Sequence, residues 1–336
     1  MEEKKVVPGT GGDHYVPYSE RSGGESVVFF TRQLSAEGLG KIYTYVQEAL
    51  KGKIAIKLHT GEKNGSNIIP RDWVRELMDG KVSDGTIIET NSYYEGDRDT
   101  TEKHRETLRV NGWTFAPVDI MDENGAVFLP IERGKWFTEM SVGKTLPEYD
   151  SLLALTHFKG HTKGGFGGSN KNIGIGCADG KTGKAMIHTT PGQNDQWDIG
   201  DEEFMERMTE STKAVIDRFG KNIAYINVMR NMSVSCDCEG IYAEPVVTPN
   251  VGICASLDIL ALDQACVDII YAMTEEENHA LVERMESRHG LRQLSYMKEL
   301  GMGNDRYRLI DIDHGDAAVV PEDVVKNLVP FGKEET

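Results

Sequence analysis

The sequence predicts an α/β protein with two lobes, built mainly from parallel strands that are flanked by helices. In the first half of the chain, strand-like and helix-like segments alternate, and this order implies parallel pairing through right-handed crossovers. A second run of strand and helix patterns follows residue 150. Ligands bind beyond the carboxyl ends of strands in such sheets, so the residues after each strand are the first candidates for a site.

Composition divides the chain into three predicted regions, one of which holds a small excursion. Residues 1–25 are rich in Gly, Pro, Ser and charge, which predicts a flexible N-terminal arm. Residues 26–150 predict an N-terminal α/β lobe, and short strand-like pieces within it, at 112–150, predict a β-rich excursion. Residues 151–336 predict a C-terminal α/β lobe that carries a Gly-rich loop.

Hydrophobic periodicity predicts the individual elements. Leu39, Ile42, Val46 and Leu50 recur at helical spacing, and Ser35 is the expected N-cap of that helix. Further helices are expected at 70–79, 100–111, 202–219, 259–273 and 277–301, the fourth capped by Ser256 or Asp258. Strands are expected at 27–31, 53–60, 86–90, 126–131, 136–142, 151–156, 223–229, 251–255 and 308–312.

Composition also restricts the class of partner. The 37 basic and 54 acidic residues leave a formal charge of −17, which argues against nucleic acid and anionic membranes as partners. No apolar run reaches the roughly 20 residues of a membrane span, and the N-terminus lacks a secretory signal pattern. Five cysteines without disulfide-domain spacing predict reduced thiols. We therefore expect a cytoplasmic protein with a small-molecule partner.

The most unusual stretch runs from His157 to His188 and follows a buried-strand pattern. Glycine at this density favours close approach to the backbone by a phosphate, a planar cofactor or another strand. We expect His157 and His161 to take part in catalysis, and Lys171 to hold an anion, form a Schiff base or attach a cofactor. The other cofactor-binding candidates here are Gly164, Gly165, Gly167, Gly168 and Asn172.

The pair Cys236 and Cys238 is the second candidate site, because two thiols one residue apart can supply two ligands to a soft or borderline metal. Cys177, a histidine of the Gly-rich stretch or a bound ligand would have to complete that site. Two inert, partly buried cysteines are the equally weighted alternative.

Further candidate residues lie at the ends of two predicted strands and inside one apolar helix. His59 and Glu62 follow one strand and form a candidate acid–base pair, with turn residues as the alternative. Asn91 follows the next strand and is a cofactor-binding candidate. Asp263 lies inside an apolar helix, where a carboxylate orients a partner or meets a buried cation.

Five segments occur in an order that resembles the domain-of-unknown-function-362 family, whose members are often labelled iron–sulfur centre proteins. These segments are IAIKLHTGE (54–62), ETNSYYEGDR (89–98), LTHFKGHTKGGFGGSNKNIGIGCA (155–178), CDC (236–238) and NVGICASLDILALDQACVD (250–268). Many relatives carry a two-cluster ferredoxin module just after the position of Cys177, whereas this chain has no cysteine in the segment that follows it. An iron or iron–sulfur site would therefore need Cys177, Cys236 and Cys238.

A weaker likeness is to lactate racemase, on the order and spacing of His161, a Gly-Gly pair, Lys171 and His188. That resemblance implies a nickel-pincer nucleotide tethered to Lys171, His188 as a nickel ligand and His161 as a base that handles a proton or hydride. The chain departs from the racemase pattern at its N-terminal catalytic histidine, which matches neither His59 nor His104, and this puts racemase activity itself in question.

The leading hypothesis is a metal- or cofactor-dependent enzyme, an oxidoreductase or isomerase, that acts on a small anionic organic substrate. The alternative is a metal or iron–sulfur carrier that uses Cys177, Cys236 and Cys238, exchanges electrons with a redox partner and has no turnover. A ligand-binding module without redox chemistry is the third hypothesis.

Overall fold

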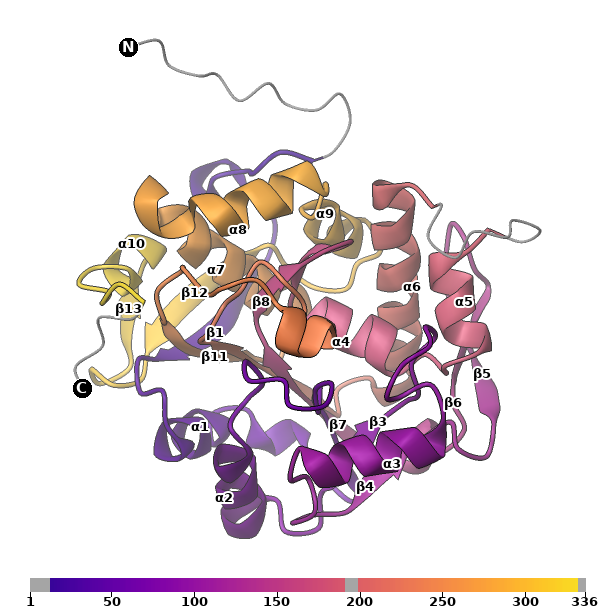
Figure 1. The fold of residues 1–336 in the computed structure, drawn as a ribbon. Coiled ribbons are helices and arrows are strands. Elements are labelled where there is room, and N and C mark those ends of the chain that lie inside the picture. Colours follow the sequence, from indigo (N-terminus) through magenta and orange to yellow (C-terminus); the bar gives the residue numbers. More distant parts are fainter. Residues whose placement is uncertain (1–12, 191–198, 332–336) are drawn as a thin grey trace.

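The computed structural model describes residues 13–190 and 199–331, and within them a mixed nine-stranded sheet forms the centre of the molecule (Figure 1). Its order is β13-β12-β1-β11-β10-β7-β2-β3-β4. The strands are β1 (Glu25–Thr31), β2 (Ile54–Lys57), β3 (Thr86–Glu89), β4 (Val118–Ile120), β7 (Ser151–His157), β10 (Ile223–Met229), β11 (Gly252–Ser256), β12 (Arg306–Asp311) and β13 (Ala317–Val319). Most neighbouring strands are parallel, so the predicted α/β class is confirmed.

The strand β7 joins the two halves of the chain. It pairs in parallel with β2 on one side and with β10 on the other, so strands from both predicted lobes belong to one sheet. Because β2, β3, β7 and β10 all run in the same direction, their carboxyl ends meet at one edge. The division into lobes after residue 150 stays a prediction.

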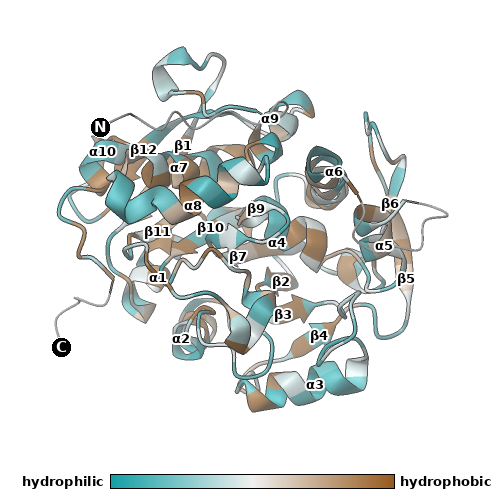
Figure 2. Cartoon of the chain, turned by 45° about the horizontal axis from the view of Figure 1, so that its top comes forward, coloured by the Kyte–Doolittle hydropathy of each residue, from teal (hydrophilic) through white to brown (hydrophobic). Residues whose placement is uncertain are grey.

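Helices cover both faces of this sheet. Alternate residues of β7 face opposite sides, with Leu153 and Leu155 in one hydrophobic core and Leu152 and Ala154 in the other. Figure 2 shows that the central strands are largely hydrophobic, whereas an outer helix such as α8 is mostly hydrophilic. The first core packs under α1 (Ala36–Tyr43), α2 (Arg71–Lys81) and α3 (Thr101–Val110), and the second under α4 (Ser169–Gly176), α6 (Asp201–Phe219) and α7 (Ile259–Ala272).

Side-chain caps fix two of the helices where the sequence predicts them. The Ser35 hydroxyl accepts a hydrogen bond from the Gly38 amide at the start of α1, and the Asp258 carboxylate accepts one from Ala261 at the start of α7. The helix expected at 277–301 is instead two helices, α8 (Glu275–Ser287) and α9 (Arg292–Glu299). The break falls where His289 takes a φ of 53°, a left-handed conformation that ends a helix.

Smaller elements complete the fold. The predicted β-rich excursion contains an antiparallel hairpin, and the Gly-rich stretch forms a second one. These elements are β5 (Ala126–Pro130) with β6 (Glu139–Gly143), β8 (Lys159–His161) with β9 (Gly165–Gly167), the helices α5 (Thr182–His188) and α10 (Pro321–Val324), and the 3₁₀ turns η1 (Tyr18–Glu20), η2 (Gln47–Ala49), η3 (Leu146–Glu148) and η4 (Asp237–Tyr242).

The predicted N-terminal arm is only partly within the described residues. Its residues 13–25 pack on the rest of the protein, because the buried Arg21 guanidinium holds the Asp268 carboxylate through two hydrogen bonds of 2.6 Å. The expectation of little packed structure therefore does not hold for this part; residues 1–12 lie outside the described residues. No helix among the described residues is long and apolar enough to cross a membrane.

Candidate functional site

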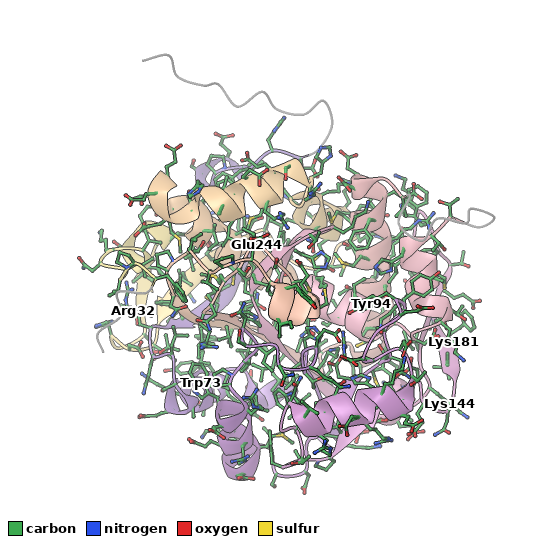
Figure 3. All side chains as sticks on the ribbon, viewed as in Figure 1. Arg32, Trp73, Tyr94, Lys144, Lys181 and Glu244 are labelled. Carbon is green, nitrogen blue, oxygen red and sulfur yellow. The ribbon has the colours of Figure 1, made fainter. Side chains whose placement is uncertain are left out.

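A cavity of about 610 Å³ lies at the carboxyl edge of the parallel strands. Its wall comes from residues at or beyond the ends of β2, β3, β7 and β10, from the β8–β9 hairpin and from one face of α4 and α5. Tyr94, which is labelled in Figure 3, is one of the wall residues. This is the edge at which the sequence predicts a site.

Two thiols and one imidazole meet beside this cavity. Their ligand atoms, from His161 at the end of β8 and from Cys236 and Cys238 in the segment after β10, lie within 4.8 Å of one another. The cysteines are the pair that the sequence predicts, and their neighbour His161 is a histidine of the Gly-rich stretch; His188, which the racemase resemblance implies as a metal ligand, is not in this group.

The Cys236 sulfur is surrounded by hydrogen-bond donors. The Lys171 ammonium and the Cys238 amide each lie 3.4 Å from its Sγ. A hydrogen bond from the Cys238 thiol, together with the Lys171 charge and the nearby His161 ring, holds the pKa of Cys236 well below its usual value although burial opposes ionisation. The same hydrogen bond and burial raise the pKa of Cys238. Of the two thiols, Cys236 is therefore the one that the site favours as a thiolate.

The His161 ring is positioned by its own turn. The Gly164 amide donates a 2.7 Å hydrogen bond to Nδ1, so the neutral ring carries its proton on Nε2. Burial and the nearby Lys171 charge lower the pKa of His161. Metal ligation by either ring nitrogen would open the Gly164 contact, because Nδ1 would then be occupied by the metal or by the proton.

This donor set fits a metal ion. Thiolate and imidazole suit soft and borderline divalent metals, and two cysteines with one histidine leave a coordination position open for a substrate or water. The Cys238 proton would be released on binding, because thiols bind metals as thiolates. Separate contacts hold the His161 ring and the Cys236 sulfur before any metal arrives.

The structure does not bring Cys177 to this group. Cys177 lies at the end of α4 in the hydrophobic core, and burial raises the pKa of its thiol to about 12. His188, in contrast, lines the cavity. Its Nδ1 donates to the Lys184 carbonyl at 2.7 Å, and burial lowers the pKa of His188 to about 4, so the ring is neutral at pH 7.

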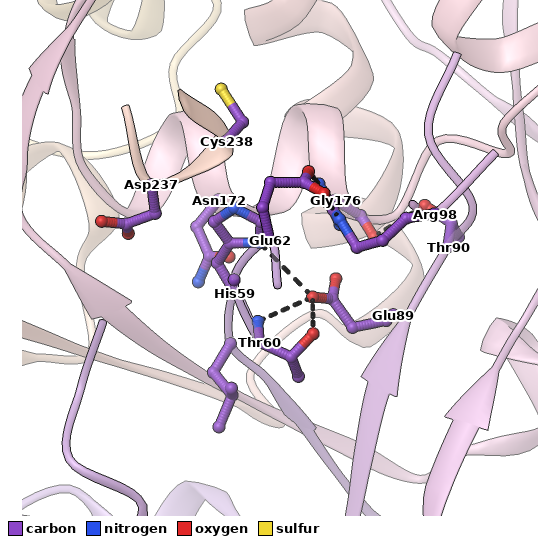
Figure 4. A network of polar contacts seen from close by, with 12 residues as sticks. His59, Thr60, Glu62, Glu89, Thr90, Arg98, Asn172, Gly176, Asp237 and Cys238 are labelled. Carbon is purple, nitrogen blue, oxygen red and sulfur yellow. Dashed lines mark hydrogen bonds and ion pairs between the residues drawn. The ribbon is translucent and has the colours of Figure 1, made fainter. Parts of the chain in front are cut away.

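The expected acid–base pair of His59 and Glu62 is not formed. Glu62 accepts hydrogen bonds of 2.8 Å from the Tyr94 hydroxyl and the Arg98 guanidinium. His59 instead directs Nδ1 toward Glu89, 3.5 Å from its Oε1 (Figure 4). The two carboxylates differ because Glu89 ends the strand β3 beside β2, whereas Glu62 lies in the loop after β2 and turns toward residues 94–98. The His59 Nε2 atom is buried and has no hydrogen-bond partner among the described residues.

Sequence reasoning missed Glu89 and its partner Lys57. The Lys57 ammonium lies 2.8 Å from Glu89 Oε2, and the Thr60 amide and hydroxyl donate to Oε1 at 2.9 and 3.0 Å. Although burial opposes ionisation, Lys57 and His59 hold the pKa of Glu89 well below its usual value. The sequence does contain a signal for this pair. Lys57 and Glu89 each end a short apolar strand, and a charged side chain that is buried there requires a partner of opposite charge.

His157 is expected to take part in catalysis, but both of its ring nitrogens contact other parts of the protein. Its Nδ1 lies 2.9 Å from both Asp237 carboxylate oxygens, and its Nε2 donates to the Arg230 carbonyl at 2.6 Å. Lys159 completes the cluster 2.8 Å from Asp237. Both ring nitrogens are occupied, so His157 holds Asp237, and with it the segment that carries both cysteines, against the end of β7.

The glycines of the Gly-rich stretch lie against protein atoms. A Cβ at Gly168 would come within 2.5 Å of the Asp263 carboxylate, and one at Gly165 would lie 2.7 Å from the Gly290 Cα. Asp263 accepts hydrogen bonds from the Ser169 and Asn170 amides, so it orients the start of α4 as a carboxylate in an apolar helix is expected to do. Of the glycines predicted to bind a cofactor, Gly168 lines the cavity, and Gly164, Gly165 and Gly167 are not among the described residues that do.

The remaining cofactor candidates divide in the same way. Asn172 lines the cavity, where its amide donates to Thr156 Oγ1 at 2.9 Å and to the Lys57 carbonyl at 3.0 Å. The Asn91 side chain contacts Thr101 and His104, and the residue is not part of the described cavity wall. Lys184, which sequence reasoning missed, does line the cavity, and burial lowers its pKa to about 8.

The buried carboxylates predict acid sensitivity. Glu89 and Asp237 have pKa values below those of the unfolded chain, so unfolding at acid pH takes up protons. Their contribution to stability is complete above about pH 4.5 and is lost as the pH falls through the folded values. We expect the free energy of unfolding, from urea titrations, to fall below pH 4.5 by about 1.4 kcal/mol per pH unit for each carboxyl. A profile that stays flat to pH 3 would contradict this electrostatic description.

Comparisons with known proteins place the chain in a family. A family model described as "Domain of unknown function (DUF362)" matches residues 54–268, well over half of the chain, which confirms the resemblance drawn from the sequence. Among curated proteins, none matches the chain.

Two solved structures are similar to this chain. The lactate racemase apoprotein from Thermoanaerobacterium thermosaccharolyticum is 17% identical with a TM-score of 0.36, and the match covers 64% of this chain and 52% of that one. A protein from Thermotoga maritima is 12% identical with a TM-score of 0.35, and that match covers 57% of this chain and 49% of the other. The chain thus spans about half the length of each, and neither likeness is close enough to carry an argument about activity.

Proposed function

We propose that this chain, which belongs to the DUF362 family, is a metal-dependent enzyme that acts on a small anionic organic molecule in the cavity. The observation that carries the proposal is a thiol–imidazole group, His161, Cys236 and Cys238, beside a cavity with a basic wall.

The charge of the wall supports an anionic ligand. The chain as a whole has a formal charge of −17. Among the described residues, its cavity wall nevertheless carries seven basic side chains (Lys57, Arg98, Lys159, Lys163, Lys171, Lys184 and Arg288) and two acidic ones (Glu89 and Glu239). Such a concentration of one sign in a concave, partly desolvated site attracts and holds the opposite charge.

Metal ligation at His161, Cys236 and Cys238 would leave Lys171 beside the bound ion. A metal ion held there supplies Lewis-acid chemistry toward a substrate oxygen. The Lys171 ammonium, which contacts the Cys236 sulfur, would balance part of the charge of the two thiolates and of the substrate. A covalent link between Lys171 and a nucleotide cofactor, which the racemase resemblance implies, stays a prediction.

Proton transfer is the task that the surroundings of His59 favour. Burial and the Arg98 charge lower the pKa of His59, so its ring is neutral at pH 7. With Nδ1 directed toward Glu89, the lone pair of Nε2 is the one left for a proton, and a substrate would have to approach this buried atom from the cavity that His59 lines. A carboxylate behind an imidazole fixes the tautomer and stabilises the imidazolium that forms when the ring takes a proton.

The test combines metal analysis with turnover. Protein purified anaerobically is analysed for metals and intact mass, then incubated in D₂O with a panel of small 2-hydroxy, 2-oxo and dicarboxylic acids and followed by NMR. We expect about one metal ion per chain and deuterium exchange or conversion of at least one acid. His59→Gln should slow that reaction by about 100-fold or more. His314→Gln is the matched control, since the His314 side chain is 71% exposed.

The outcomes separate the hypotheses. Metal-free protein that leaves every acid unchanged would contradict the proposal. Metal-loaded protein without any reaction would favour the carrier hypothesis, with Cys236 and Cys238 as ligands but without Cys177, which the structure places in the core.

A further inference from the structure

The end of α8 lies across the two segments that carry the thiol–imidazole group. The Arg284 guanidinium donates to the Val234 carbonyl at 3.0 Å, two residues before Cys236. Beyond the helix, the Gly290 backbone touches Gly165 in the hairpin of His161, so closely that a Cβ on Gly165 would lie 2.7 Å from the Gly290 Cα. Arg288 stands between these two contacts and lines the cavity.

Within residues 13–190 and 199–331, Arg288 is a basic wall residue without a partner. The side chain is half-buried, and its Nε is fully buried without a hydrogen-bond partner. Among the residues that the structure describes, none forms a hydrogen bond or an ion pair with any Arg288 nitrogen. The other wall cations differ: Arg98 holds Glu62, Lys159 holds Asp237 and Lys163 holds Asp201.

An unpaired guanidinium in such a position calls for an external partner. Removing a charge from water is unfavourable unless another charge or a set of hydrogen bonds compensates it. The guanidinium presents donors in a planar fork that matches the two oxygens of a carboxylate or phosphate, and such bidentate pairs are the strong ones. A ligand in the cavity can provide this partner, because the cavity is the space that Arg288 borders.

We propose that Arg288 binds the carboxylate or phosphate of the substrate and thereby determines which molecules the cavity accepts. This inference rests on the proposed function, since it assigns the anion-binding residue of the same cavity. It defines the substrate class as a small organic acid whose anionic group lies at Arg288 and whose remaining atoms reach toward His161. Arg288 lies outside residues 54–268, so this specificity is set by a part of the chain that the family model does not cover.

Equilibrium binding of two defined anions tests the proposal. Malonate and inorganic phosphate are titrated by calorimetry into the wild-type protein as purified and into Arg288→Gln, Arg288→Lys and Arg109→Gln. Arg109 is the charge-matched control, with a side chain that is 67% exposed on α3. We expect at least one anion to bind the wild type and to bind Arg288→Gln about tenfold more weakly or worse. Arg288→Lys should fall between them, because lysine keeps the charge but not the fork.

Each outcome has a defined meaning. Preference for malonate would assign a carboxylate to the Arg288 position, and preference for phosphate a phosphate group. Equal affinities in the wild type and Arg288→Gln, or no binding of either anion to the wild type, would overturn the proposal. Metal content and melting temperature measured on the same samples keep this failure distinct from that of the proposed function, since an unused Arg288 leaves the metal bound and the fold intact.

Discussion

Replacing Cys236 with serine is expected to lower the bound metal from about one ion per chain to less than about a tenth of that. The Cys236 sulfur receives hydrogen bonds from Lys171 and from the Cys238 amide, and these contacts favour its thiolate form. A serine hydroxyl stays protonated at pH 7 and is a poor metal ligand. His161 and Cys238 would remain, and two ligands without the thiolate are too few to retain the ion.

The control for this prediction is Cys177→Ala. Cys177 is also a buried cysteine, but it lies in the hydrophobic core and outside the thiol–imidazole group. We expect this variant to lose stability through its small cavity and to keep its metal. Elemental analysis of the three proteins, purified in parallel, decides the matter. Loss of metal from Cys177→Ala with retention in Cys236→Ser would reverse the assignment of ligands.

The second large effect is expected at Glu89, where Glu89→Ala should reduce the free energy of unfolding by about 3–5 kcal/mol. The substitution leaves the Lys57 ammonium without its carboxylate in a site where both side chains are almost fully buried. It also removes the acceptor of the Thr60 amide and hydroxyl. Urea denaturation at pH 7 measures the loss.

The same variant should lose the proton-transfer activity of His59, since Nδ1 loses its carboxylate.

An exposed ion pair provides the comparison. Arg105 and Glu123 lie 2.6 Å apart with half-exposed side chains, and Glu123→Ala should change the free energy of unfolding by less than about 1 kcal/mol. The double variant Lys57→Met, Glu89→Leu should recover much of the loss, because it leaves no unpaired charge. Equal small effects of Glu89→Ala and Glu123→Ala would show that the buried pair does not hold the ends of β2 and β3 together.

Periodicity and caps predict most of the architecture. The apolar runs of β7 and β10 and the helical stripe of α6 identify buried elements because their periods match the side-chain geometry of strands and helices. The order of the strands in the sheet does not follow from these patterns, because β1 inserts between β11 and β12, which come from the other end of the chain. The break between α8 and α9 falls at a left-handed residue, His289, and the next residue, Gly290, is the local signal that the helical prediction over 277–301 passes over.

The candidate site is predictable only in part, because contacts between distant segments do not follow from local sequence patterns. The C-x-C spacing and the Gly-rich stretch are local signals, and the structure brings Cys236, Cys238 and His161 together. Which carboxylate meets His59 depends on the parallel pairing of β2 and β3, so the sequence alone points to the local neighbour Glu62 and does not reveal Glu89. Arg288 follows a helix far along the chain and has no motif around it, so its place at the cavity emerges only from packing.

X-ray absorption spectroscopy of the anaerobically purified protein, at the edge of the metal that it contains, tests the central claim most directly. The account predicts a first coordination shell with two sulfur atoms at about 2.3 Å and one imidazole nitrogen at about 2.0 Å if the metal is zinc, with lighter atoms in the open position. In the small amount of metal that Cys236→Ser retains, the sulfur contribution should fall to one atom, the Cys238 sulfur. A shell of oxygen and nitrogen atoms without sulfur would contradict the claim that His161, Cys236 and Cys238 form a metal centre.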